Sequence, residues 1–131
     1  MFHLENLVNR WRRPNEKRYR LVPLDWWAED EGPLNFEPPV IVGRSERATL
    51  RLIDPWISRL HCELLERDGR LLVRDLESRH GVFVNGQRVS QMELQSGDVL
   101  HLGVSQFRVE YIPASDIPAP AQPPLDKKEA V

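Results

Sequence analysis

The sequence contains a single cysteine and no long apolar run, and these two absences exclude several classes of protein. Cys62 cannot form an internal disulfide, so neither a disulfide-stapled fold nor an oxidising compartment is implied. No stretch approaches the roughly 18 apolar residues that a membrane-spanning helix needs, and the N-terminus lacks the uninterrupted apolar stretch of a signal peptide. We therefore expect a cytoplasmic protein that has no membrane partner.

The sequence also lacks a large excess of charge and any cluster of metal ligands. Its 18 lysines and arginines are set against 20 aspartates and glutamates, which gives a net charge of -2 and no bulk reason to bind nucleic acid. The four histidines and one cysteine are scattered without the spacing of metal ligands. We expect no cofactor, no metal and no specific nucleic-acid partner, and we expect a monomer.

The 131 residues fit one globular domain with tails, and charge and proline content mark the boundaries. The first 20 residues carry six basic and two acidic side chains, whereas the next 19 carry five acidic and no basic ones. A short helix and a disordered segment both remain open for the N-terminal part, because about twelve residues are marginal for an isolated helix. The predicted parts are a basic N-terminal segment (1–18), a domain (19–112) with an acidic insertion (25–39), and a Pro-rich disordered tail (113–131).

Helical periodicity is missing between the two tails. The apolar residues there alternate with a period of two and turn signals recur every several residues, which is typical of an all-β sandwich or barrel. Asp68-Gly69 and Asn85-Gly86 tolerate the positive φ that two-residue hairpin turns need, and each pair therefore predicts a hairpin. The expected strands are Tyr19–Leu24, Val40–Gly43, Thr49–Leu52, Leu60–Glu66, Arg70–Asp75, Gly81–Val84, Gln87–Ser90, Asp98–Leu102 and Gln106–Ile112.

Three predicted loops, at residues 43–45, 55–61 and 77–81, each combine an arginine with a hydroxyl or imidazole group. If these loops meet at one end of a sandwich, they form a pocket that suits a phosphate. A phosphorylated side chain carries a charge of about -1.5 to -2 and three acceptor oxygens, which guanidinium groups match bidentately. The side chains expected in this pocket are Arg44, Ser58, Arg59 and Arg79.

Four motifs follow one another through these loops: Gly43-Arg44, Ser58-Arg59-Leu60-His61, Asp75-Leu76-Glu77-Ser78 and Gly81-Val82-Phe83-Val84-Asn85-Gly86. In their order and spacing they resemble the forkhead-associated (FHA) domain family over about residues 19–112. The resemblance implies an all-β, FHA-like sandwich of about ten or eleven mostly antiparallel strands with its binding loops at one end. It also implies a non-catalytic adaptor in Ser/Thr kinase signalling, whose partner is a phosphothreonine-containing protein, either a kinase substrate or the kinase itself.

The resemblance assigns phosphopeptide binding to Arg44, Ser58, Arg59, Arg79 and His80. Arg44 and Ser58 would hold the phosphate through the guanidinium and the hydroxyl, and the backbone amide of Ser58 would be a further donor. The residues that would support the site structurally are Gly43, His61, Gly81, Asn85 and Gly86.

The chain departs from the family pattern at Arg79-His80-Gly81-Val82, where the family commonly has Thr-Asn-Gly-Thr. His80 stands in place of an asparagine that usually fastens the backbone of the bound peptide. A neutral imidazole replaces that amide only in part. Arg79 adds a positive charge near the phosphate, and we expect this charge to strengthen binding.

Two residues near the motifs are expected to have packing roles. Trp56, just before the phosphate-binding serine, is expected to pack the loop rather than to contact the ligand. Cys62 lies on the same apolar phase as Leu60 and Leu64, so we expect it to be an inert core residue.

Two other interpretations of the chain are weaker. Ser58, His61 and Asp75 could form a hydrolase trio, but alternation is expected to place Ser58 and His61 on opposite faces, and no oxyanion-hole glycines accompany the serine. We therefore do not expect an enzyme. The alternative function is an FHA-fold scaffold with a degenerate phosphate pocket, which binds an unphosphorylated partner through a sheet face or through the 25–39 insertion.

Overall fold

A computed structural model of the chain describes residues 18–25 and 32–113. Within these ranges it contains eleven β-strands and no helix, which confirms the all-β class. In the same part of the chain no helix is long and apolar enough to span a membrane. Most of the predicted N-terminal segment and tail, together with Trp26 and Trp27, lie outside the described residues.

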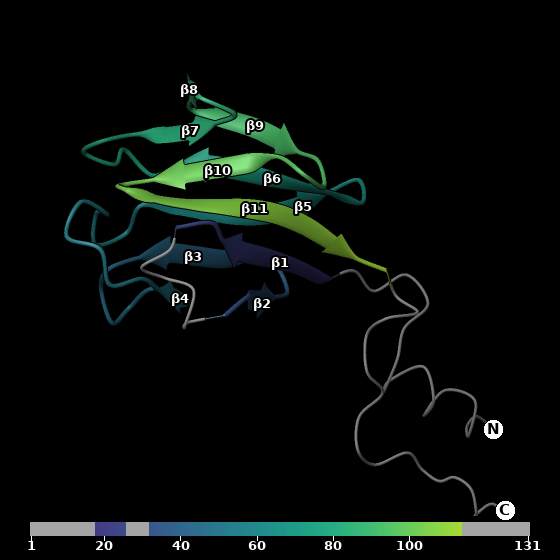
Figure 1. Cartoon of the computed structure of the whole chain (residues 1–131), viewed down its shortest axis with the longest axis horizontal. Coiled ribbons are helices and arrows are strands. Elements are labelled where there is room, and N and C mark those ends of the chain that lie inside the picture. Colours follow the sequence, from purple (N-terminus) through teal and green to yellow (C-terminus); the bar gives the residue numbers. More distant parts are fainter. Residues whose placement is uncertain (1–17, 26–31, 114–131) are drawn as a thin grey trace, which may run out of the picture. The chain divides into compact units, whose positions relative to one another are not determined.

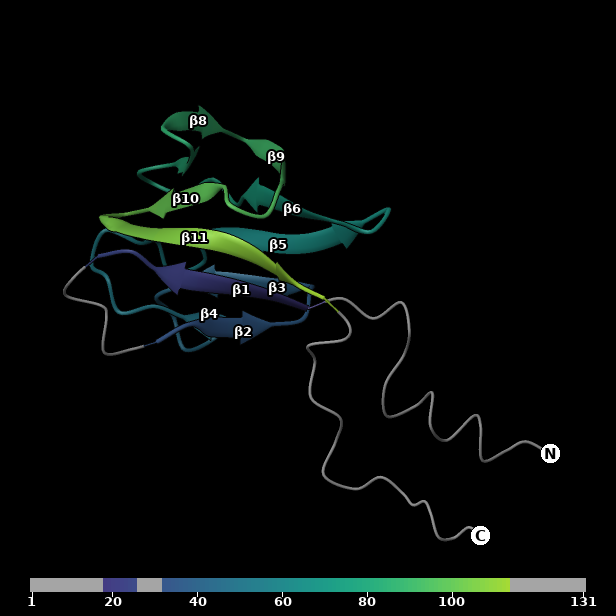
Figure 2. The same cartoon turned by 45° about the vertical axis from the view of Figure 1, so that its right-hand side comes forward.

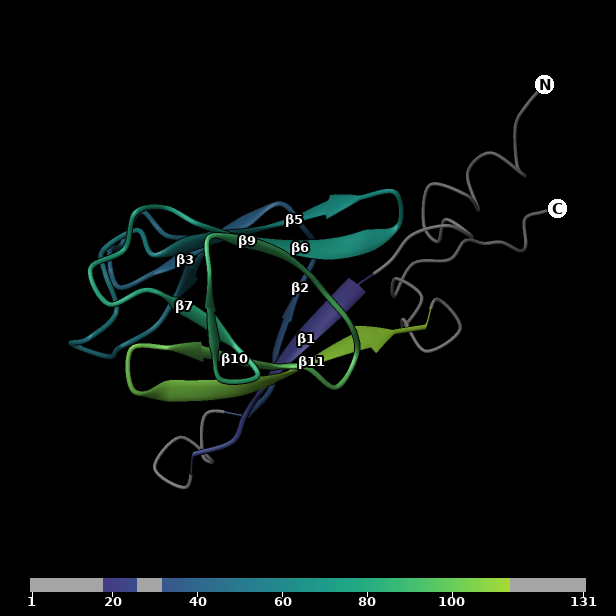
Figure 3. The same cartoon turned by 90° about the horizontal axis from the view of Figure 1, so that it is seen from above.

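The strands form two sheets that face each other as layers (Figures 1 and 3). Neighbouring strands such as β5 and β6 pair antiparallel, whereas β3 and β4 pair in parallel. The first sheet has the order β2-β1-β11-β10-β7-β8, with strands at Leu34–Phe36, Arg18–Pro23, Ser105–Ile112, Val99–Leu102, Val82–Val84 and Gln87–Val89. The second sheet has the order β4-β3-β5-β6-β9, with strands at Leu50–Arg51, Val40–Gly43, Cys62–Arg67, Arg70–Asp75 and Gln91–Leu94.

The core lies between the two sheets and consists of the inward-facing residue of each alternating pair. Leu64 on β5 and Val73 on β6 are register partners, and both are fully buried. Cys62 is fully buried in the same cluster, which confirms its expected core position. Leu60, however, is exposed, because β5 begins only at Cys62 and Leu60 lies in the preceding turn. Its expected place in the core was therefore wrong.

Both predicted hairpins are confirmed. Asp68 and Gly69 join β5 to β6 with φ angles of 54° and 77°, and Asn85 and Gly86 join β7 to β8 with φ angles of 51° and 86°. Asparagine, aspartate and glycine adopt this left-handed region most readily, which explains why the sequence marks these turns so clearly.

Two strands were not predicted. β2 lies inside the stretch that was expected to be an insertion, and its three residues pair antiparallel with β1. β9 pairs with β6, and only Leu94 of its four residues is fully buried. The other strands differ from the predicted ranges by at most two residues at an end, and Val40–Gly43 and Arg70–Asp75 are as predicted.

The loops that position the site gather at one end of the sandwich (Figure 2). The β3–β4 and β4–β5 loops are joined by main-chain hydrogen bonds, from the Arg44 amide to the Ser58 carbonyl (3.0 Å) and from the Ser45 amide to the Arg59 carbonyl (3.1 Å). The amide of Leu76, at the start of the β6–β7 loop, donates to the carbonyl of His61 (3.0 Å). The three motif-bearing loops are therefore held against one another by the backbone.

Candidate functional site

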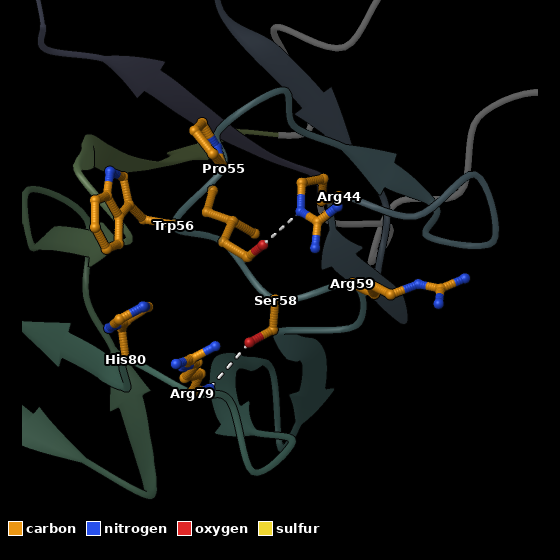
Figure 4. Close-up of a pocket in the computed structure, with 8 residues that line it drawn as sticks. Arg44, Pro55, Trp56, Ser58, Arg59, Arg79 and His80 are labelled. Carbon is orange, nitrogen blue, oxygen red and sulfur yellow. Dashed lines mark hydrogen bonds between the residues drawn. The ribbon is translucent and has the colours of Figure 1, made fainter.

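A cavity of about 350 Å³ opens between these loops (Figure 4). The structure brings together around it all five residues that the sequence assigned to phosphopeptide binding. They come from three separate loops, and each loop is fixed at both ends by the strands that it connects. The lining residues are Arg44, Pro55, Trp56, Ile57, Ser58, Arg59, Arg79 and His80.

Arg44 is oriented by a main-chain acceptor on the neighbouring loop. Its Nε donates to the carbonyl oxygen of Ile57 at 3.0 Å, which leaves the two terminal nitrogens of the guanidinium available (Figure 4). Gly43 makes this close approach of the loops possible, because a Cβ at that position would lie 2.1 Å from the carbonyl oxygen of Arg59. Gly43 therefore supports the site by leaving room for a backbone contact.

Ser58 links two loops and still keeps a donor. Its Oγ accepts a hydrogen bond from the Arg79 amide at 2.9 Å, so the hydroxyl proton remains available to a ligand. Its backbone amide donates to Nδ1 of His61 at 3.0 Å. The amide was expected to be a further phosphate donor, but this bond to the imidazole already occupies it.

His61 is fully buried and connects the Ser58 loop to the β6–β7 loop. Because Nδ1 accepts from the Ser58 amide, Nε2 carries the proton and donates to the Gly81 carbonyl oxygen at 2.8 Å. Burial lowers the pKa of the imidazole below its usual value, and the Gly81 hydrogen bond opposes that shift in part. His61 is therefore a neutral connector.

The expectation that Ser58 and His61 point to opposite faces was wrong, because Ser58 Oγ contacts the Arg79 amide and His61 Nε2 contacts the Gly81 carbonyl, so both side chains reach the same loop. Alternation applies only within a strand, and Ser58 precedes the first residue of β5 by four positions, in a turn. The proximity does not create a catalytic pair, since main-chain groups take both ring nitrogens of His61 and the Ser58 hydroxyl contacts the Arg79 amide.

The β6–β7 loop is shaped by two side chains that the motif contained but that were not assigned to binding or to support of the site. The Asp75 carboxylate accepts from the Ser78 amide at 2.9 Å, and the Ser78 hydroxyl accepts from the Gly81 amide at 3.0 Å. Gly81 has a φ of 91°, which few other residues adopt. These bonds bracket Arg79 and His80 and hold them at the edge of the cavity.

Asp54 is the main supporting residue that sequence reasoning missed. Its side chain is 4% exposed, and its carboxylate accepts from the amides of Trp56 (2.8 Å) and Val104 (3.0 Å) and from the hydroxyl of Ser105 (2.8 Å). The carboxylate thereby ties the β4–β5 loop to the β10–β11 turn. The Asp-Pro-Trp sequence offers a local signal, because aspartate often accepts from the amide two residues later.

Trp56 and His80 form one wall of the cavity. Their ring centroids are 5.2 Å apart with an interplanar angle of 70°, and Trp56 is 52% exposed. Trp56 was expected to pack the loop rather than face a ligand, but it lies open to the cavity beside His80 (Figure 4). The side of the cavity opposite Arg44 therefore carries two aromatic rings, with Arg79 beside His80.

Comparison with known proteins identifies this arrangement. The sequence model of the FHA domain matches residues 40–103, which contain all the motifs around the cavity. The chain belongs to the FHA domain family. The two-sheet β-sandwich of the described residues matches the fold of solved FHA domains.

Three comparisons show how far the FHA match extends. The chain is similar to the FHA domain-containing protein FhaA of Mycobacterium tuberculosis, with 41% identity over 70 residues, or 53% of the chain and 13% of that protein. It is similar to an FHA structure solved in an analysis of phosphothreonine-dependent FHA interactions, with 31% identity, a TM-score of 0.64 and coverage of 71% and 95% of the two chains. The FhaA FHA domain, solved in complex with the intracellular domain of Rv3910, has 30% identity, a TM-score of 0.61 and coverage of 72% and 99%.

Asn85 and Gly86 lie in the β7–β8 turn of the FHA domain and do not line its cavity. The Asn85 side chain donates to the Asp98 carboxylate at 3.1 Å and accepts from the Val99 amide at 2.9 Å, so it joins this turn to the start of β10. Within the described ranges, no group of three or more histidine, cysteine, aspartate or glutamate side chains could hold a metal ion.

Proposed function

We propose that this FHA domain is a phosphothreonine-dependent, non-catalytic interaction module. One observation carries the proposal: the terminal nitrogens of Arg44 and the hydroxyl proton of Ser58 are both available at one cavity, on side chains whose other groups are already fixed. Arg59 lines the same cavity, and neither arginine has a carboxylate partner among the residues described. Unpaired guanidinium groups and a hydroxyl are the donors that a phosphate dianion prefers.

The flanking peptide would be held by Arg79 and His80. Both are exposed, and the loop that carries them is pinned by hydrogen bonds to Asp75 and Ser78. The partner would be a cytoplasmic protein phosphorylated on threonine by a Ser/Thr kinase. The related FHA structures support this inference, because one concerns phosphothreonine-dependent interactions and the other is a complex with an intracellular domain. We further propose residues 19–112 as the binding unit, flanked by a basic segment and a Pro-rich tail.

A degenerate peptide library in three forms tests the proposal. The library carries phosphothreonine, phosphoserine or unmodified threonine at one fixed position and is titrated against the full chain. We expect saturable binding of the phosphothreonine form and none of the unmodified form. Equal binding of all three forms would contradict the proposal and favour a scaffold that binds unphosphorylated partners.

A further inference from the structure

Ion pairing divides the described arginines into two groups. Four of them, Arg20, Arg70, Arg74 and Arg108, pair with glutamates, whereas sheet residues Arg67 and Arg88 have no such partner among the residues described. Within the described ranges, the four arginines of the segment 44–59 have no such partner: Arg44, Arg47, Arg51 and Arg59. Of these four, Arg44 and Arg59 line the cavity, so the proposed phosphate site leaves Arg47 and Arg51 without a role.

Arg51 is held next to Arg44 by the backbone. β3 and β4 run in parallel with Gly43 opposite Arg51, and the Leu52 amide donates to the Gly43 carbonyl at 2.8 Å. The Nε of Arg51 then donates to the carbonyl oxygen of Arg44 at 3.0 Å. This bond anchors the exposed Arg51 side chain to the backbone of Arg44, a residue proposed to bind the phosphate.

Arg44 and Arg51 present their guanidinium groups in the same way. Each donates its Nε to a main-chain carbonyl at 3.0 Å, and the two terminal nitrogens, with four of the five N–H donors, have no hydrogen-bond partner among the residues described. Such a fork matches a carboxylate or a phosphate. Because its aim is already fixed, Arg51 loses less side-chain entropy on binding an anion than a free surface arginine would.

The local charge favours an anion. The segment from 44 to 51, which is the β3–β4 loop and β4, holds Arg44, Arg47 and Arg51 against a single carboxylate, that of Glu46, which is exposed and forms no ion pair with a described residue. Across the cavity, Trp56 and His80 place their rings together, and Arg79 lies beside His80 (Figure 4). A ligand therefore meets positive charge on the β3–β4 side and meets both aromatic rings and the Arg79 guanidinium on the other.

We propose that Arg51 binds a second anionic group of the same ligand, on one side of the phosphothreonine only. The group is a carboxylate or a second phosphate, and the domain therefore prefers acidic or doubly phosphorylated sequences. This inference rests on the proposed function, since the first phosphate has to occupy the Arg44 and Ser58 site.

A peptide scan by fluorescence anisotropy tests the inference. The reference peptide has phosphothreonine with uncharged flanks, and in the others an aspartate is moved through four positions on each side. A last peptide carries phosphoserine at the best position. We expect aspartate to tighten binding about three- to tenfold on one side only, phosphoserine to tighten it further, and both gains to shrink in high salt.

Variants show whether Arg51 is the source of the gain. Arg51→Gln should bring the ratio of the affinities for acidic and neutral peptides to about one. Arg67 is an exposed arginine at the far end of β5, and Arg67→Gln should leave this ratio unchanged. Arg51→Glu should reverse the ratio, a result that a purely structural role would not produce. Circular dichroism melting of each variant verifies the fold.

Two results would overturn the inference. If the neutral phosphopeptide binds but aspartate gives no gain on either side, or if Arg51→Gln keeps the gain, Arg51 does not bind a second anion. If no phosphopeptide binds at all, the proposed function fails, and this inference fails with it. The neutral peptide therefore separates the two failures.

Discussion

The buried imidazole of His61 receives the main-chain amide of Ser58 on Nδ1 at 3.0 Å, in the same loop that offers the Ser58 hydroxyl to the cavity. The other ring nitrogen lies 2.8 Å from the carbonyl oxygen of Gly81. One neutral ring therefore sets the spacing between the serine and the loop of Arg79 and His80. The geometry of the proposed phosphate site depends on a residue that does not line the cavity.

Removing this ring should destabilise the domain. We expect His61→Ala to lower the free energy of unfolding by about 2–4 kcal/mol, because it opens a cavity and leaves the Ser58 amide and the Gly81 carbonyl unpaired. Urea denaturation measures the change. His101→Ala is the control, since this half-buried histidine on β10 should cost about 1 kcal/mol. Equal losses in the two variants would show that the buried hydrogen bonds of His61 contribute little.

Acid should weaken the fold through the same residue. Burial places the pKa of His61 in the folded state below its usual value of 6.5, so the unfolded chain binds more protons between the two pKa values. Stability is therefore complete above the unfolded pKa and decreases as the pH falls through the folded one, by at most about 1.4 kcal/mol per pH unit. Urea midpoints from pH 7.5 to 5 for wild type and His61→Ala isolate this contribution. Parallel curves would contradict it.

Losing the Arg44 guanidinium should reduce phosphopeptide affinity without unfolding the domain. We expect Arg44→Gln to weaken binding about 10- to 100-fold, because it removes charge-assisted hydrogen bonds to the phosphate. Isothermal titration calorimetry gives the affinity, and thermal melting verifies the fold. Arg67→Gln should bind like wild type. An unchanged affinity in Arg44→Gln would place the phosphate elsewhere.

Asp54 should stabilise the loop end of the sandwich. Asp54→Ala leaves two amides and a hydroxyl without their acceptor, and we expect a loss of about 2–4 kcal/mol in the free energy of unfolding. Ser105→Ala removes only one of these donors and should cost about 1 kcal/mol. Chemical denaturation compares the two. The role given to Asp54 would be wrong if its variant were no less stable than Ser105→Ala.

Local signals in the sequence predicted much of the fold. Turn residues with positive φ fixed both two-residue hairpins, and alternation located most strands of the sandwich. β2 and β9 were not predicted because each is defined by its pairing with another strand, β1 for β2 and β6 for β9. A strand of three or four residues has too few positions to show alternation by itself.

The sequence predicted the side chains that would bind the ligand but not the hydrogen bonds that support them. Order and spacing of the motifs brought out Arg44 and Ser58, whereas the contact of Ser58 with His61 arises from a turn that alternation does not describe. Asp54 was missed because its partners Val104 and Ser105 lie about 50 residues later in the chain. Contacts of this kind become visible only when the loops are placed in space.

The most direct test of the account is an NMR titration of the isotope-labelled chain with one phosphothreonine peptide and with the unphosphorylated peptide of the same sequence. The account predicts that the phosphorylated form alone shifts the Arg44 Nε–H resonance and the amides of Ser58 and Arg79, while the sheet faces stay unchanged. Shifts confined to a sheet face, or identical shifts with both peptides, would contradict it.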